Sequence, residues 1–183
     1  MPNRGPDGPT PDRPDPDHMT GLNGRFALLL DAITQAARRL YADRLESVAV
    51  FGSVGRGTMR PDSDIDLLLI VDPLPDGRLH RLEEFAPVEA AVAPLLGQGR
   101  AAHLHTCLSP IIRTPAEARA GSPLMFDMIE DARLLYDPHG LLRHTLDDLK
   151  DRLDRLGARR VWCDGWWYWD LKPDLRPGET FTI

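Results

Sequence analysis

The chain has few cysteines and few lysines, and it contains no long apolar run. Cys107 and Cys163 show no metal-ligand spacing, so we expect two small buried side chains rather than a disulfide or a metal site. With only Lys150 and Lys172 as lysines and a net charge of −6, general nucleic-acid binding is disfavoured, because that affinity comes largely from neutralised phosphates. Without a membrane-length apolar run or a secretion signal, we expect a cytoplasmic protein that does not bind membranes.

The length of 183 residues, 42% of them hydrophobic, suffices for one compact core. Residues 1–20 hold six of the 17 prolines and almost nothing apolar, so we expect a disordered proline-rich tail. A proline-rich ligand for another domain is the alternative. We assign residues 21–136 to the main domain, and residues 137–183 to a C-terminal helix and β-hairpin that pack on it.

The spacing of apolar residues predicts alternating helices and strands. We expect, in chain order, a helix from Leu22, strands at 46–51 and 65–71, a helix at 86–96, a strand at 101–108, a helix begun by a Thr114–Glu117 capping box, a helix at 122–136, a leucine-striped helix that ends at Gly157, and a hairpin that turns at Asp164–Gly165. The leucine stripe suits a core-facing helix, with docking of a partner helix as the alternative.

Two aspartates stand where the apolar strand 65–71 begins. Because alternate residues of a strand point to one face, the carboxylates of Asp64 and Asp66 should lie side by side and repel each other. A divalent cation relieves this repulsion, and Mg²⁺ prefers carboxylate oxygens. Asp62, further back in the loop, is expected to be a turn or cap residue.

A glycine-rich loop precedes these aspartates. Gly52, Gly55 and Gly57 allow sharp turns and close approach of the backbone to a ligand, while Ser53 adds a hydroxyl group and Arg56 a positive charge. Together the loop and the aspartates indicate a phosphate site that faces a metal site, an arrangement suited to attack on a nucleotide phosphate.

The segment 52–69, GSVGRGTMRPDSDIDLLL, resembles the signature of the DNA polymerase β nucleotidyltransferase superfamily, especially its minimal nucleotidyltransferases. The resemblance implies an α/β (α+β) fold with a small mixed sheet flanked by helices. It also implies that Asp64 and Asp66 are catalytic and bind Mg²⁺, and that Gly52, Ser53, Arg56 and Ser63 bind the nucleotide.

The same resemblance implies the reaction and the partner. Members transfer a nucleoside monophosphate, often AMP from ATP, to a hydroxyl group, and minimal members often accompany HEPN-type toxins, some as antitoxins that adenylylate the toxin.

Active members usually carry a third carboxylate on a later strand, but the expected strand 101–108 has none. His103 and His105 share one face of it and could bind Mn²⁺ or Zn²⁺ or act as a base, although two partly buried histidines are the simpler interpretation. Glu89 and Glu117 could fold back but are expected to face solvent. The missing acid leaves open a nucleotide-binding or antitoxin subunit that acts by contact, and transfer to a small molecule is a third option.

All four tryptophans, Trp162, Trp166, Trp167 and Trp169, fall beside Tyr168. We expect a hairpin whose aromatic side chains cover the sheet. Three adjacent aromatics at 166–168 must expose at least one side chain to the other face, so a partner or homo-oligomer surface is the alternative.

Overall fold

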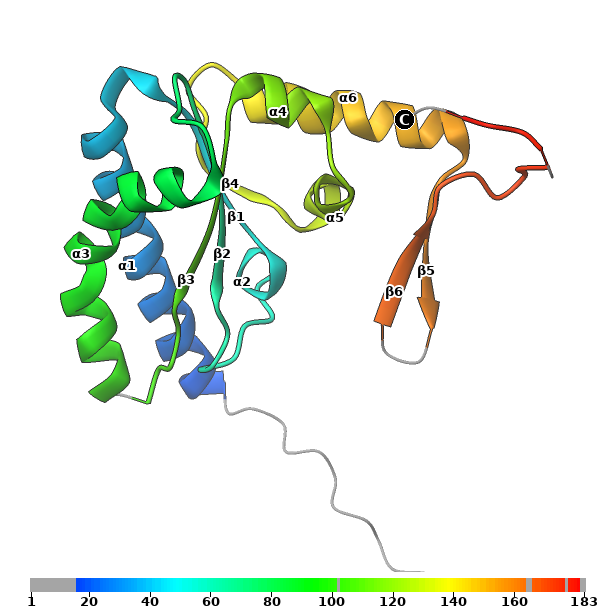
Figure 1. The fold of residues 1–183 in the computed structure, drawn as a ribbon. Coiled ribbons are helices and arrows are strands. Elements are labelled where there is room, and N and C mark those ends of the chain that lie inside the picture. The colour runs from blue at the N-terminus through cyan, green and yellow to red at the C-terminus, as the bar shows by residue number, and fades with distance from the viewer. Residues whose placement is uncertain (1–15, 102, 164–165, 177, 182–183) are drawn as a thin grey trace, which may run out of the picture.

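The computed structural model describes residues 16–101, 103–163, 166–176 and 178–181 (Figure 1). Helix α1 spans Pro16–Tyr41 and therefore begins six residues before the expected start at Leu22. Residues 16–20 are thus helical, which corrects the predicted extent of the disordered tail, and the rest of that tail lies outside the described residues.

A four-stranded mixed sheet forms the centre of the fold. Its strands are β1 (Leu45–Phe51), β2 (Ile65–Val71), β3 (Leu108–Arg113) and β4 (Arg133–Tyr136), in the order β3-β2-β1-β4. β1 is antiparallel to β2 and to β4, whereas β2 and β3 are parallel. A short 3-10 helix at Ala42–Arg44 leads into β1. The predicted α/β class with a small mixed sheet is confirmed.

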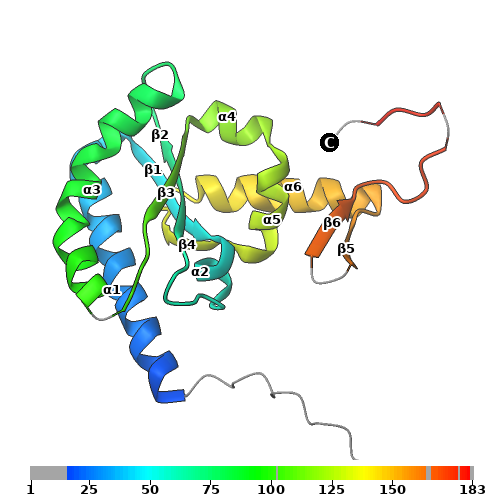
Figure 2. The ribbon, with the colours of Figure 1, turned by 60° about the horizontal axis from the view of Figure 1, so that its bottom comes forward.

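Helices cover both faces of the sheet (Figures 1 and 2). On one face α1 packs with α3 (Arg78–Ala101), and on the other lie α4 (Pro115–Ala120), α5 (Pro123–Asp131) and α6 (Leu141–Leu156). In β2, Leu67 and Leu69 belong to the first core and Leu68 and Ile70 to the second. This burial on both faces is what the unbroken apolar run predicted.

Helix α3 is much longer than the predicted helix at 86–96, and both Pro87 and Pro94 lie inside it. Each proline removes a helical hydrogen bond. The buried side chains of Phe85, Val88 and Val92 continue one apolar stripe across Pro87, so packing onto the core outweighs the local cost. As a result, the predicted strand at 101–108 is wrong, and the third strand begins only at Leu108.

The region after β3 was predicted in part. The Thr114–Glu117 capping box starts α4 as expected, with both reciprocal hydrogen bonds present. The predicted helix at 122–136 is wrong in its second half, because α5 ends at Asp131 and the next strand, β4, pairs with β1. Helix α6 carries the leucine stripe on its buried side and ends at Gly157, which has a φ of 70°.

The C-terminal hairpin consists of the antiparallel strands β5 (Arg159–Cys163) and β6 (Trp166–Asp170). The predicted turn at 164–165 lies outside the described residues. The ring of Trp169 packs edge-on against Phe126 of α5, with centroids 6.2 Å apart, so β6 contacts the helical layer.

Cys107 and Cys163 are free thiols and both are exposed, so their expected burial is wrong. Within the part of the chain that the structure describes, no helix is both long and apolar enough to cross a bilayer.

Candidate active site

The loop and the aspartates meet at one end of the β1–β2 pair. Phe51, the last residue of β1, is paired with Asp66 of β2. The chain therefore enters the glycine-rich segment directly beside the Asp66 side chain. Asp64 stands just before the strand, which begins at Ile65. The segment 52–56, expected to be a loop, forms the short helix α2 (Gly52–Arg56).

Gly52 has a φ of 64°, in the left-handed region that favours glycine. A Cβ atom at this position would lie only 2.5 Å from Oδ2 of Asp66. The close approach predicted for the glycines therefore occurs here between the backbone and a candidate metal-binding carboxylate. A side chain at position 52 would occupy the space of that carboxylate.

The pKa of Asp66 is raised above its ordinary value. Partial burial is the largest cause and the negative charge of Asp64 adds to it, while a hydrogen bond with Ser109 and the charge of Arg56 act in the opposite direction. Asp64 is thus close enough to repel Asp66, as predicted. A cation between the two carboxylates would relieve both the repulsion and the desolvation.

Two carboxylates at an open sheet end are a donor set that fits Mg²⁺, which binds few protein oxygens and completes its shell with water and phosphate oxygens. Over the described residues, no group of three or more His, Cys, Asp or Glu side chains is placed to hold a metal ion together.

Strand β3 lies beside the aspartates and was misplaced by the sequence analysis. Ser109 is paired with Asp66, and Cys107, just before the strand, donates a hydrogen bond of 2.9 Å from Sγ to Oδ1 of Asp64. The pKa of the Cys107 thiol is raised, first by this hydrogen bond and then by burial and the charge of Asp64. A hydroxyl and a thiol therefore stand where a third carboxylate was sought.

The alternatives considered for that third acid lie elsewhere. His103 and His105 are exposed residues of the connection between α3 and β3, so they do not share the face of a strand. Glu89 is exposed on α3 as expected. Glu117, expected to face solvent, instead forms an ion pair with Arg81 of α3 at 2.7 Å.

The turn between α2 and β2 is held by its own side chains. Ser63 Oγ accepts a hydrogen bond of 2.9 Å from the backbone N–H of Arg60, and Ser63 donates its own N–H to the Arg60 carbonyl at 3.0 Å. Asp62 pairs with Arg60 at 3.1 Å, in agreement with the predicted turn role. The described contacts of Ser63 stabilise this turn, and its predicted role in nucleotide binding stays a prediction.

Arg56, at the end of α2, is held by an acid and an aromatic ring. Its guanidinium forms an ion pair with Asp131, whose side chain is only 4% exposed at the end of α5. The same group lies 5.3 Å from the ring centroid of Trp167. Arg56 also lowers the pKa of Asp66, so its charge reaches the carboxylate pair.

The hairpin completes this cluster. Arg160 of β5 lies 3.2 Å from Asp127 and 3.5 Å from Asp131, and 4.6 Å from the ring centroid of Trp167. The indole N–H groups of Trp167 and Trp169 both donate to Oδ1 of Asp127. Burial by itself raises the pKa of Asp127, but these hydrogen bonds and Arg160 lower it overall. We call Arg56, Asp127, Asp131, Arg160 and Trp167 the hairpin cluster.

Most of this cluster was not predicted. Roles were predicted for Arg56 and for the tryptophans, but none for Asp127, Asp131 or Arg160. The sequence signal is that three acids, Asp127, Glu130 and Asp131, interrupt the otherwise apolar segment 124–132. In the structure, Asp131 is buried. A buried acid requires a partner, so its burial implies a cation from elsewhere in the chain.

Part of the chain is similar to known proteins. Residues 30–110 match the family described as the nucleotidyltransferase domain. A protein of Methanocaldococcus jannaschii, provisionally named protein adenylyltransferase MJ1305, is 27% identical over 130 residues, which cover 70% of this chain and 83% of that protein.

Two solved structures are similar to the chain. One is a crystal structure of a toxin–antitoxin with AMP-PNP, with 16% identity over 74% of this chain and 92% of that chain and a TM-score of 0.39. The other is of the toxin–antitoxin MntA-HepT, with 15% identity over 72% and 92% of the two chains and a TM-score of 0.39. The segment 30–110, which includes Gly52, Ser53, Asp64 and Asp66, is thus similar to the nucleotidyltransferase domain family.

Proposed function

We propose that the chain is a minimal nucleotidyltransferase that transfers AMP from ATP to a hydroxyl group, with Mg²⁺ bound by Asp64 and Asp66. The acceptor that we propose is a hydroxyl on a partner protein of the HEPN toxin class, so the chain would serve as an antitoxin. The M. jannaschii relative, named as a protein adenylyltransferase, supports a protein acceptor.

One observation carries this proposal: the Gly52 backbone lies against the Asp66 carboxylate, which Asp64 repels. Two mutually repelling acids beside a glycine in a left-handed conformation would not stabilise an ordinary strand end. They suit a site for a metal–triphosphate complex, because the bound metal neutralises the developing charge of the transition state and the nearby backbone positions the phosphates.

Each candidate site residue has its own role in the proposed reaction. Asp64 and Asp66 hold their oxygens at the open end of the sheet, where the acceptor oxygen would bond to the α-phosphorus as the bond to pyrophosphate breaks. Ser53 offers a hydroxyl group to the phosphates. Arg56, positioned by Asp131 and Trp167, supplies a positive charge beside α2.

The test is to incubate the protein with Mg²⁺ and ATP labelled at the α-phosphate, together with the protein encoded beside it. We expect label on the partner protein, and none when the label is placed at the γ-phosphate. Asp64→Asn combined with Asp66→Asn should abolish labelling. The matched control, Asp147→Asn with Asp151→Asn, makes the same charge change on the exposed side of α6 and should leave labelling intact.

Labelling that persists in the Asp64/Asp66 double variant would disprove the proposed role of these carboxylates. Label from the γ-phosphate would indicate phosphoryl transfer and would contradict nucleotidyl transfer.

A second candidate function is neutralisation of the partner by contact, without catalysis. Ser109 and Cys107 beside the aspartates favour it, as do the exposed side chains of Trp162 and Tyr168, which are 65% and 47% exposed. In that case, neutralisation should survive the Asp64/Asp66 double variant and fail after Trp162→Ser with Tyr168→Ser. The opposite pattern would remove this candidate.

A further inference from the structure

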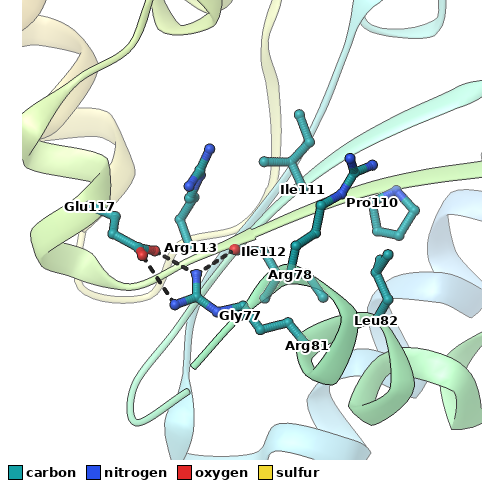
Figure 3. Close-up of a pocket in the computed structure, with 9 residues that line it drawn as sticks. All are labelled: Gly77, Arg78, Arg81, Leu82, Pro110, Ile111, Ile112, Arg113 and Glu117. Atoms are coloured by element: carbon teal, nitrogen blue, oxygen red, sulfur yellow. Dashed lines mark hydrogen bonds and ion pairs between the residues drawn. The ribbon is translucent and has the colours of Figure 1, made fainter. Parts of the chain in front are cut away.

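A cavity whose lining contains neither Asp64 nor Asp66 opens between the start of α3, strand β3 and helix α4 (Figure 3). Its volume is about 400 Å³. The nucleotidyltransferase aspartates lie at the beginning of β2 and β3, where Asp66 pairs with Ser109, whereas the cavity reaches Arg113 at the other end of β3. On β3 the cavity lining begins at Pro110, next to Ser109, but Arg113 lies four residues beyond Ser109, about 13 Å away at about 3.3 Å per residue.

One arginine of the cavity, Arg81, is occupied by hydrogen bonds and an ion pair within the fold. Arg81 donates to the carbonyl groups of Pro75 and Ile112 at 2.9 and 3.2 Å, and it forms two hydrogen bonds with Glu117. Its side chain is 12% exposed. Arg81 therefore connects α3 to β3 and α4 and lines the cavity in a fixed position.

Two other arginines face the cavity without this kind of support. Arg78 and Arg113 are exposed, and neither guanidinium has an ion pair or a side-chain hydrogen bond with any described residue. In Figure 3 their guanidinium groups lie on either side of Ile111. With Arg81 paired to Glu117, the lining carries an excess of two positive charges in a chain whose net charge is −6.

The cavity runs along an open sheet edge, but this edge is unsuited to an added strand. β3 is an outer strand, and its residue Pro110 has no N–H to offer. The carbonyl of Ile112 is already bound by Arg81. An occupant would therefore be held by side chains rather than by the backbone pairing that extends a sheet.

The rest of the lining is apolar. Leu82, Pro110 and Ile111 form one side, and a neighbouring cavity of about 190 Å³ shares Ile111, Arg113 and Glu117 and continues toward Met125 and Met128. A bare inorganic anion would leave this apolar surface unused. Burial of an apolar body here would add to the binding free energy.

We propose that this cavity binds an organic phosphate monoester, separately from the nucleotidyl-transfer site. The phosphate, which carries nearly two negative charges near neutral pH, is held between Arg78 and Arg113, whose planar guanidinium groups match phosphate oxygens. The apolar body of the ligand lies against Ile111 and Leu82. The proposal does not depend on the proposed transfer reaction.

Phenyl phosphate is a suitable probe, because it has an aromatic body and a phosphate group but no nucleoside. Titration in the presence of EDTA keeps metal-dependent binding at Asp64 and Asp66 out of the measurement. Calorimetry gives the affinity, and amide chemical shifts locate the site. We expect saturable binding with shifts confined to residues 77–82 and 110–117.

Arg78→Gln with Arg113→Gln should weaken binding by about tenfold or more, because two charge-assisted contacts are lost. The control, Arg39→Gln with Arg133→Gln, removes two exposed arginines outside the cavity and should bind normally. Asp64→Asn with Asp66→Asn should also bind normally. Both cavity substitutions are at exposed positions, and a urea titration checks that the fold is retained.

Four outcomes would overturn the proposal: no saturable binding, equal affinity for inorganic phosphate, unchanged affinity in the Arg78/Arg113 variant, or chemical shifts centred on residues 52–66. The shift map uses the unmodified protein, so the proposal remains testable even if a variant fails to fold.

Discussion

Replacement of Gly52 by alanine should damage metal and nucleotide binding far more than it damages folding. Gly52 has a φ of 64° and Gly57 a φ of 73°, both in the left-handed region. An alanine at either position would therefore raise the free energy of the folded backbone by a similar amount, about 1–2 kcal/mol. Only at position 52 does the new Cβ meet the Asp66 carboxylate, at 2.5 Å; at position 57 nothing lies within 4 Å. Gly57→Ala is therefore a matched control for backbone strain.

The extra effect at position 52 comes from displacement of a reacting group. Relief of the 2.5 Å contact requires a shift of about 1 Å, and misplacement on this scale costs about a hundredfold in rate. We expect both variants to lose about 1–2 kcal/mol of unfolding free energy in urea titrations. Gly52→Ala should in addition lose about a hundredfold in transfer of the α-phosphate label and bind Mn²⁺ more weakly.

The measurements are urea unfolding, Mn²⁺ titration by electron paramagnetic resonance and the labelling assay, performed on both variants in parallel. If Gly52→Ala binds Mn²⁺ as tightly as Gly57→Ala does, the contact between the loop and Asp66 has no bearing on the site and the reasoning fails. An equal loss of activity in both variants would mean that backbone strain, rather than the position of the carboxylate, sets the rate.

Three further predictions concern the hairpin cluster and α4. In urea titrations, Asp131→Ala should lower the unfolding free energy by about 3 kcal/mol, because Arg56 and Arg160 lose a buried partner. The control, Asp154→Ala, breaks an exposed helical ion pair and should lower it by about 0.5 kcal/mol. Trp167→Ala should weaken the binding of a non-hydrolysable ATP analogue several-fold in calorimetry, because Arg56 loses the ring that holds it. Trp167→Phe keeps a ring for the cation and should restore part of this affinity. Equal affinity in the wild type and both variants would contradict this role of Trp167. Arg81 holds the pKa of Glu117 below its ordinary value. Glu117 should therefore stabilise the fold at pH values above the ordinary carboxyl pKa, and this contribution should be lost as the pH falls through the lowered pKa. Glu117→Gln should flatten that part of the pH dependence of the unfolding free energy, and an unchanged slope would refute the assignment.

The sequence predicted the parts of the fold whose residues interact with near neighbours. The strands β1 and β2, the capping box at Thr114 and the stripe of α6 all follow from local spacing, and the structure contains them. Asp66 also lies at the start of β2 as expected, paired with Phe51, whereas the metal-binding role of Asp64 and Asp66 stays a prediction.

The parts that failed depend on distant partners. Residues 133–136 are apolar enough to continue a helix, and they form a strand because β1 offers its open edge. Helix α3 runs through Pro87 because its apolar side chains reach the core on both sides of it. Arg56 and Asp131 are 75 residues apart, and no local pattern could pair them.

The placement of the aromatic residues gives the protein a built-in optical reporter. Every tryptophan of the chain lies within 162–169, and the indole of Trp167 contacts the arginine at the end of α2. Indole emission responds to nearby charge and to solvent access. The emission of Trp167 therefore reports on the surroundings of α2, so changes there can be followed by light without an attached dye.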